Sequence, residues 1–216
     1  MKYNINQLSS ISEINKITIR SWEERHDFLV AERTNTNIRQ YSTEQLLCAI
    51  NVKVLLGEGY KISKISKRSY TEINDLVNNI FLDKDSDNKA VYISRIIRSA
   101  VLNNRDLFDS TIYNGFNKFG LADFYSSIMF ISLQKIGQIW EVHSNDKRHE
   151  SFVFSLLQEK INDITSEIIT NKFSKDIWLL FIMSPYIFLN RDKGHFVSLN
   201  NTVKMVADAA GNIGKH

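Results

Sequence analysis

Apolar residues recur every three or four positions along most of this chain, a spacing typical of amphipathic helices rather than strands. In the first third the pattern predicts helices over residues 5–13, 18–26, 43–57 and 70–81, with a shorter one starting at 60. Ser42 and Gln45 form a capping-box pattern before the third of these. Residues 32–41 break the period, because Asn and Thr lie between β-friendly neighbours, and this favours a hairpin.

A polar, acidic stretch over residues 82–88 separates this block from the next, and we place a domain boundary there. Helical spacing over residues 90–102, 105–119, 121–140 and 148–170 then predicts a four-helix bundle. Residues 176–183 form an apolar run, a turn follows at Pro185, and residues 199–210 favour a helix that ends at Gly211. Strand, loop and helix begin an α/β unit, and the chain ends before a second parallel strand.

We therefore expect a mainly α chain in three parts. They are a DNA-binding domain over 1–81, the helical bundle over 88–172 and an incomplete, flavodoxin-like α/β segment over 173–216. Composition agrees, because only one Pro and eight Gly occur among 216 residues. The chain shows no secretory signal and no apolar run long enough to cross a membrane, so we expect a cytoplasmic protein.

A single cysteine, Cys48, lies in an apolar helical context. It excludes a disulfide framework or a paired-thiol metal sensor within one chain, and its expected place is the core. No catalytic constellation is present either. Glu141, His143, His149 and Glu150 are close in sequence, but immediate neighbours on a helix do not converge on one point. We therefore expect neither an enzyme nor a metal site.

The net charge of +3 is too small to indicate a nucleic-acid partner, so placement has to carry that argument. Between positions 16 and 39 there are five basic and four acidic residues. The basic residues lie on a predicted helix and on the adjoining hairpin. A helix can enter the major groove of DNA while a basic hairpin holds the flanking phosphates.

The motifs in this region resemble the MerR family of winged-helix regulators. They are TIRSWEER at 18–25, then Arg33, Arg39, Tyr41 and Ser42, then LLGEGYKISKI at 55–65. The resemblance covers residues 3–80, with one departure: the family's usual Pro before the wing arginine is absent from Ala31-Glu32-Arg33. It implies a transcriptional regulator that binds double-stranded operator DNA as a homodimer or higher homo-oligomer.

The same resemblance suggests roles for individual side chains. Thr18, Arg20 and Ser21 would meet base edges or phosphates, Lys16 and Arg25 would lie near the backbone, and Arg33, Arg39 and Tyr41 would hold phosphates from the wing. Lys61, with Lys64, would add a flanking contact to the DNA from the later helix. For Arg20 and Arg25 the alternative is a solvated helix face. Trp22 and Tyr41 are expected to pack between helix and wing rather than to stack on bases.

The second block resembles the helical cap of cobalamin-binding, light-sensing regulators, through Ile136-Gly137-Gln138-Ile139-Trp140 and His149-Glu150-Ser151-Phe152. The resemblance implies that Trp140 covers cobalamin, that Glu150 is the cap glutamate and that His195 is the cobalt ligand. Ser151 stands where the family has His, and Lys193 and Ser198 depart from the family's pattern around the ligand. The alternatives are a packing role for Trp140, a loop position for His195, and a bundle that serves only to bind a protein partner.

Overall fold

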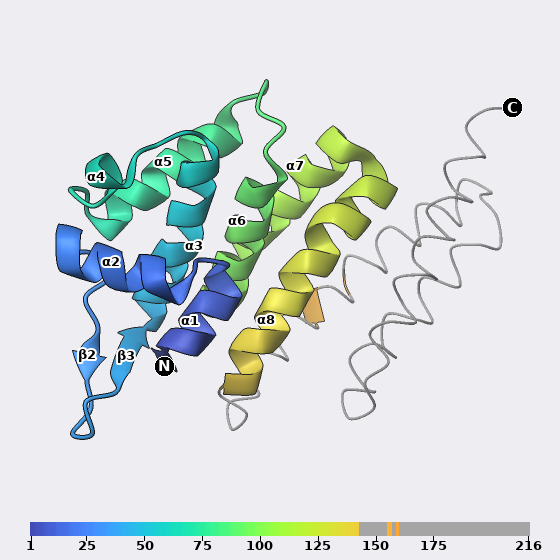
Figure 1. Ribbon diagram of the computed structural model, residues 1–216. Coiled ribbons are helices and arrows are strands. Elements are labelled where there is room, and N and C mark those ends of the chain that lie inside the picture. The colour runs from blue at the N-terminus through green and yellow to red at the C-terminus, as the bar shows by residue number, and fades with distance from the viewer. Residues whose placement is uncertain (143–154, 157–158, 160–216) are drawn as a thin grey trace, which may run out of the picture.

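The computed structural model describes residues 1–142, 155–156 and 159, and these are mainly helical, as the sequence predicts (Figure 1). The elements in chain order are β1 (Lys2–Asn4), α1 (Ile5–Ser12), α2 (Lys16–His26), β2 (Glu32–Arg33), β3 (Arg39–Ser42), α3 (Thr43–Gly57), α4 (Ile62–Ile65), α5 (Tyr70–Leu82), α6 (Lys89–Leu102), α7 (Arg105–Phe124), the π-helix η1 (Tyr125–Met129) and α8 (Phe130–Val142).

Local capping sets the helix starts in the N-terminal block. Ser42 Oγ accepts from the Gln45 backbone N–H at 3.1 Å, and Gln45 Oε1 accepts from the Ser42 backbone N–H at 2.8 Å, which confirms the predicted capping box. Asn15 caps α2, so this helix begins at Lys16 rather than at Thr18, where the pattern placed it. The cap places two more side chains, those of positions 16 and 17, on the first turn of the helix.

The hairpin predicted over 32–41 is present as β2 and β3, which pair antiparallel with Arg33 opposite Arg39. The sequence did not predict the third strand, β1, which pairs antiparallel with β3 and gives the sheet order β1-β3-β2. Tyr3 and Tyr41 face each other in this pairing, and both are fully buried. The sheet thus fixes the hairpin to the core beside α1 and α3, which both contact β3.

Helices α6 to α8 form the described part of the second block. Gly120 has φ 74° and ψ 165° and interrupts α7, so the helical runs meet at the break predicted between 119 and 121. Glycine is suited to this position because a positive φ is strained for residues with a Cβ atom. The predicted helix over 148–170 and the α/β segment over 173–216 lie outside the described residues or almost entirely so, and both stay predictions.

The two blocks pack against each other. Helix α3 contacts both α5 and α6, α1 contacts α8, and buried apolar residues of both blocks form one cluster. At the α3–α6 contact the buried Ser94 hydroxyl donates to Asn51 Oδ1. Residues 83–88, where we predicted a domain boundary, form the connection between α5 and α6. Because α5 also contacts α6, the second block packs on the first through α1, α3 and α5.

Cys48 is 3% exposed within this cluster, as predicted, and burial raises the pKa of its thiol to about 12. A thiol that stays protonated at neutral pH is a poor nucleophile and metal ligand, so Cys48 acts as a small core residue. None of the helices among the described residues combines the length and the apolar character that crossing a membrane requires.

Candidate nucleic-acid interface

Helix α2 has one face in the core and the other in solvent. Ile19 is fully buried and Trp22 is 6% exposed, with its ring centroid 6.4 Å from that of Phe28. On the remaining surface Thr18 and Ser21 are partly exposed, and the exposed side chains are those of Lys16, Ile17, Arg20, Glu24 and Arg25. The residues predicted to contact DNA from this helix therefore lie at or near the surface, while the predicted packing residue Trp22 lies inside.

Two arginines on this surface are unpaired within the described part of the chain. Neither Arg20 nor Arg25 makes a hydrogen bond or a salt bridge there, although Glu24 lies on the same helix. Arg25 is in the last turn of α2, where a positive charge also stabilises the helix dipole. Arg20 lies in the middle of the helix and has no such role, so its charge is available to an external anion.

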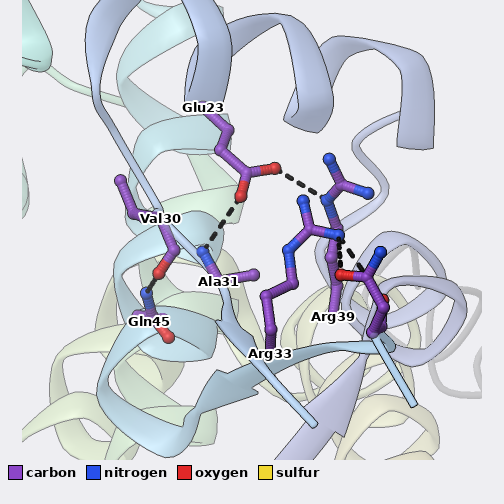
Figure 2. Close-up of polar contacts among 7 residues, drawn as sticks. Glu23, Val30, Ala31, Arg33, Arg39 and Gln45 are labelled. Carbon is purple, nitrogen blue, oxygen red and sulfur yellow. Dashed lines mark hydrogen bonds and ion pairs between the residues drawn. The ribbon is translucent and has the colours of Figure 1, made fainter. Parts of the chain in front are cut away.

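The β2–β3 hairpin, called the wing from here on, is held against α2 by one carboxylate (Figure 2). Glu23 Oε2 lies 2.7 Å from Arg39 Nε, and Glu23 Oε1 accepts from the Ala31 backbone N–H at 3.3 Å. The Glu23 side chain is only 12% exposed, and this contact raises the pKa of the Arg39 guanidinium. At the start of the wing strand, Gln45 Nε2 donates to the Val30 carbonyl at 2.7 Å. The wing is thereby positioned relative to both α2 and α3.

Arg33 and Arg39 lie directly opposite each other on β2 and β3. Like charges at opposed positions destabilise a strand pair, so this arrangement needs compensation. Glu23 supplies it for Arg39, while Arg33 Nη1 donates only to neutral acceptors, the Asn37 carbonyl at 3.4 Å and Asn37 Oδ1 at 3.3 Å. The result is a two-arginine site on the hairpin with one carboxylate behind it, which suits a phosphate in front.

Tyr41 requires a correction. It is fully buried, its hydroxyl has no hydrogen-bond partner among the described residues, and burial raises its pKa. This placement fits the packing role expected beside Trp22 and does not support the phosphate contact that the resemblance implied for it. A residue buried beneath the wing orients the strand that carries Arg39 and does not reach the ligand.

The remaining predicted residues differ in their surroundings. Lys16 Nζ donates to Asn6 Oδ1 at 3.0 Å, so α1 steadies a charge at the start of α2. Lys61 and Lys64 are exposed on and beside α4, and their side chains form no hydrogen bond or salt bridge with described residues. They belong to a separate element, α4 and the residue before it.

Sequence reasoning missed the role of Glu23. It is part of the TIRSWEER motif, but its partner Arg39 is 16 positions away, and nothing in either segment alone indicates the pair. It also passed over Ile17, which is 74% exposed on the same helix.

In the second block, Trp140 is 6% exposed and belongs to the core cluster, as the packing alternative expects. Glu150 and His195 lie outside the described residues, so a cobalamin site stays a prediction. Among the residues that the structure describes, no three His, Cys, Asp or Glu side chains are grouped as metal ligands.

Comparison with known proteins agrees with the geometry of the first block. No curated protein matches the chain. A family model described as "MerR HTH family regulatory protein" matches residues 3–70, which run from β1 to the first residue of α5. This part of the chain is therefore similar to the helix-turn-helix domains of a regulatory protein family.

Proposed function

We propose that this protein is a transcriptional regulator that binds double-stranded operator DNA through the surface formed by α2 and the β2–β3 wing. The observation that carries the proposal is a set of arginines on one surface, of which Arg20, Arg25 and Arg33 form no ion pair with described residues. Arg20 and Arg25 are unpaired in the described residues, and Arg33 faces Arg39 across the hairpin. The family match over residues 3–70 supports the same function.

In this proposal the helix reads bases and the wing holds the backbone. Arg20 has the geometry to bond the two acceptors of a guanine in the major groove, with Thr18 and Ser21 beside it. Lys16, Arg25, Arg33 and Arg39 contact phosphates, which position the protein without reading sequence. Lys61 adds a phosphate contact at the flank.

The second block would serve as an effector or oligomerisation domain. A homodimer would place two α2 helices in major grooves about one helical turn apart, on a palindromic site. The packing of α6 on α3 and of α8 on α1 gives the second block direct contact with the proposed DNA-binding module. A ligand or partner bound to that block would thus act through packed helices.

The test compares Arg20→Ala with the wild type of the full chain. Duplexes enriched from a random DNA pool serve as probes in an anisotropy titration at fixed salt. We expect Arg20→Ala to weaken binding by about five- to 150-fold, because one bidentate contact to guanine contributes about 1–3 kcal/mol of discrimination. Arg105→Ala is the control for net charge, since Arg105 is exposed on α7, outside the proposed surface, where it pairs with Asp109 and Glu159.

A second measurement separates base reading from phosphate contact. Removing one phosphate contact lowers the slope of log affinity against log salt by about 0.9, so we expect this change for Arg25→Ala. The proposed function is wrong if the random pool yields no enriched sequence. It is also wrong if Arg20→Ala binds the enriched DNA as tightly as the wild type and the Arg105→Ala control do.

A further inference from the structure

Ile17 is the most exposed large apolar residue in the described part of the chain, at 74%. It occupies the first turn of α2, directly after Lys16. The fold gains little from it there, because a β-branched side chain lowers helix propensity and a side chain this exposed buries little apolar surface. Its apolar side chain is therefore available for contact with a partner outside the described fold.

Its position on the helix shows what that partner would be. Residues three and four apart lie on the same side of a helix, so Ile17 shares a side with Arg20 and Ser21. Ile19 and Trp22 lie in the core on the other side. Ile17 therefore belongs to the surface that the proposed function directs into the major groove, beside the residue proposed to bond guanine.

We infer that Ile17 is a specificity-determining residue that packs against the 5-methyl group of a thymine in the operator. This inference rests on the proposed function and extends it to one base. In the major groove thymine alone presents a methyl group, and apolar side chains recognise it by direct contact. The first turn of a recognition helix is the part that reaches base edges, which places Ile17 at the right depth.

The inferred contact of Ile17 lies next to the proposed contact of Arg20 with guanine. Because Ile17 and Arg20 are one turn apart on one side of α2, the thymine that Ile17 covers would lie within a few base pairs of the guanine that Arg20 bonds. Each half-site would then contain a thymine and a guanine at a fixed spacing. Loss of either side chain would relax selection at its own position and leave the other position unchanged.

The experiment removes the methyl group from the DNA instead of the protein. Each thymine of an enriched duplex is replaced in turn by deoxyuridine, which keeps base pairing and hydrogen-bonding groups and lacks only the methyl. The full-length wild type and Ile17→Ala are titrated against every duplex at the same salt concentration. Leu82→Ala is the matched control, because Leu82 is also an exposed aliphatic residue, at 72%, but lies at the end of α5, outside the proposed DNA-binding surface.

We expect deoxyuridine at one thymine per half-site to weaken wild-type binding about fourfold, the effect of leaving one methyl-sized group uncovered. Ile17→Ala should bind the thymine duplex at least as weakly and show no further loss with deoxyuridine. Leu82→Ala should respond to deoxyuridine as the wild type does. Circular dichroism should show unchanged helix content in both variants, since both side chains are exposed.

The inference is overturned if the wild type binds the enriched DNA and no deoxyuridine substitution weakens that binding. It also fails if the same substitution weakens wild type and Ile17→Ala equally, because the methyl group would then be read by another residue. Both results leave the proposed function standing. Failure to enrich any sequence would instead contradict the proposed function and the inference together.

Discussion

Two helices of this protein carry pairs of arginines in opposite circumstances. On α2, Arg20 and Arg25 are exposed and unpaired within the described residues. On α6, the guanidinium of Arg95 lies 3.8 Å from the centroid of the Phe81 ring, and its Nε donates to Thr111 Oγ1 at 3.2 Å. Burial lowers the pKa of Arg95 to about 10 and also lowers that of Arg98.

The difference shows that residue type alone does not locate a binding surface. Arg95 and Arg98 are three apart on α6 and would look like a basic patch in the sequence. In the structure, however, Arg95 packs on an aromatic ring and bonds to neutral side chains, as a partly buried arginine can. The arginines of α2 contribute no such contact to the fold. Exposed arginines that make no hydrogen bond or ion pair with described residues are therefore the better indicator of a ligand surface.

The largest expected effect is on the stability of the second block, and it tests whether Trp140 packs in the core. Trp140→Ala should lower the free energy of unfolding by about 3–5 kcal/mol, because it removes a large core side chain and leaves a cavity. Denaturant unfolding measures this, with Glu141→Ala as the control, an exposed neighbour on α8. A loss below about 1 kcal/mol would show that Trp140 does not pack in the core and would favour its alternative role as a ligand cover.

The arginines of α2 and α6 should give smaller effects on stability and DNA binding, in opposite directions. Arg95→Ala should lower the free energy of unfolding by about 1–2 kcal/mol through loss of the contact with Phe81, and should leave DNA affinity unchanged. Arg20→Ala should change unfolding by less than about 0.5 kcal/mol, because it alters an exposed position, and should weaken DNA binding. Equal effects of the two variants on either measurement would remove the distinction between the two arginine pairs.

Local features of the sequence explain which parts of the fold were predictable. The capping box at Ser42 and the break at Gly120 act within a few residues, so the pattern places α3 and divides α7 correctly. The pairing of Tyr3 with Tyr41 joins segments far apart in the chain. Strand β1 is only three residues long, which is too short for an alternating pattern, so residue spacing does not predict it.

The candidate site also has features that the sequence predicts and features that it does not. Exposure of Arg20 and burial of Trp22 follow from helical period alone, so both were predictable. The ion pair between Glu23 and Arg39 depends on how the wing folds back on α2, and the burial of Tyr41 depends on the sheet that β1 completes. Tertiary contacts decide these positions, and the spacing of residues within one element carries no information about them.

The next smaller effect concerns the wing. Glu23→Gln should lower the free energy of unfolding by about 1 kcal/mol, less than the loss of a full charged hydrogen bond, because the amide oxygen still accepts from Ala31. Amide hydrogen exchange at Ala31 should quicken. Glu24→Gln is the matched control, since Glu24 is exposed and its carboxylate makes no hydrogen bond or salt bridge in the described residues. Equal behaviour of the two variants would mean that Glu23 does not position the wing.

The smallest effect concerns one polar link between the two blocks. Lys135 on α8 donates to the Ile11 carbonyl at 2.9 Å and to Glu13 Oε1 at 2.7 Å, at the C-terminal end of α1. The carbonyls in the last turn of a helix lack helical partners, and a cation there also stabilises the helix dipole. Lys135→Met keeps most of the apolar stem, so its effect isolates the ammonium group.

We expect Lys135→Met to lower the free energy of unfolding by about 0.5–1 kcal/mol, the range of a charge at a helix end. Glu13→Gln should have a smaller effect, because the Glu13 side chain is 61% exposed while that of Lys135 is 13% exposed. If instead Glu13→Gln matches Lys135→Met, the ion pair and not the carbonyl contact joins α8 to α1. The second block would then be linked to α1 mainly by a solvent-screened pair, and raising the salt concentration from 0.1 M to 1 M would remove the difference between Lys135→Met and the wild type.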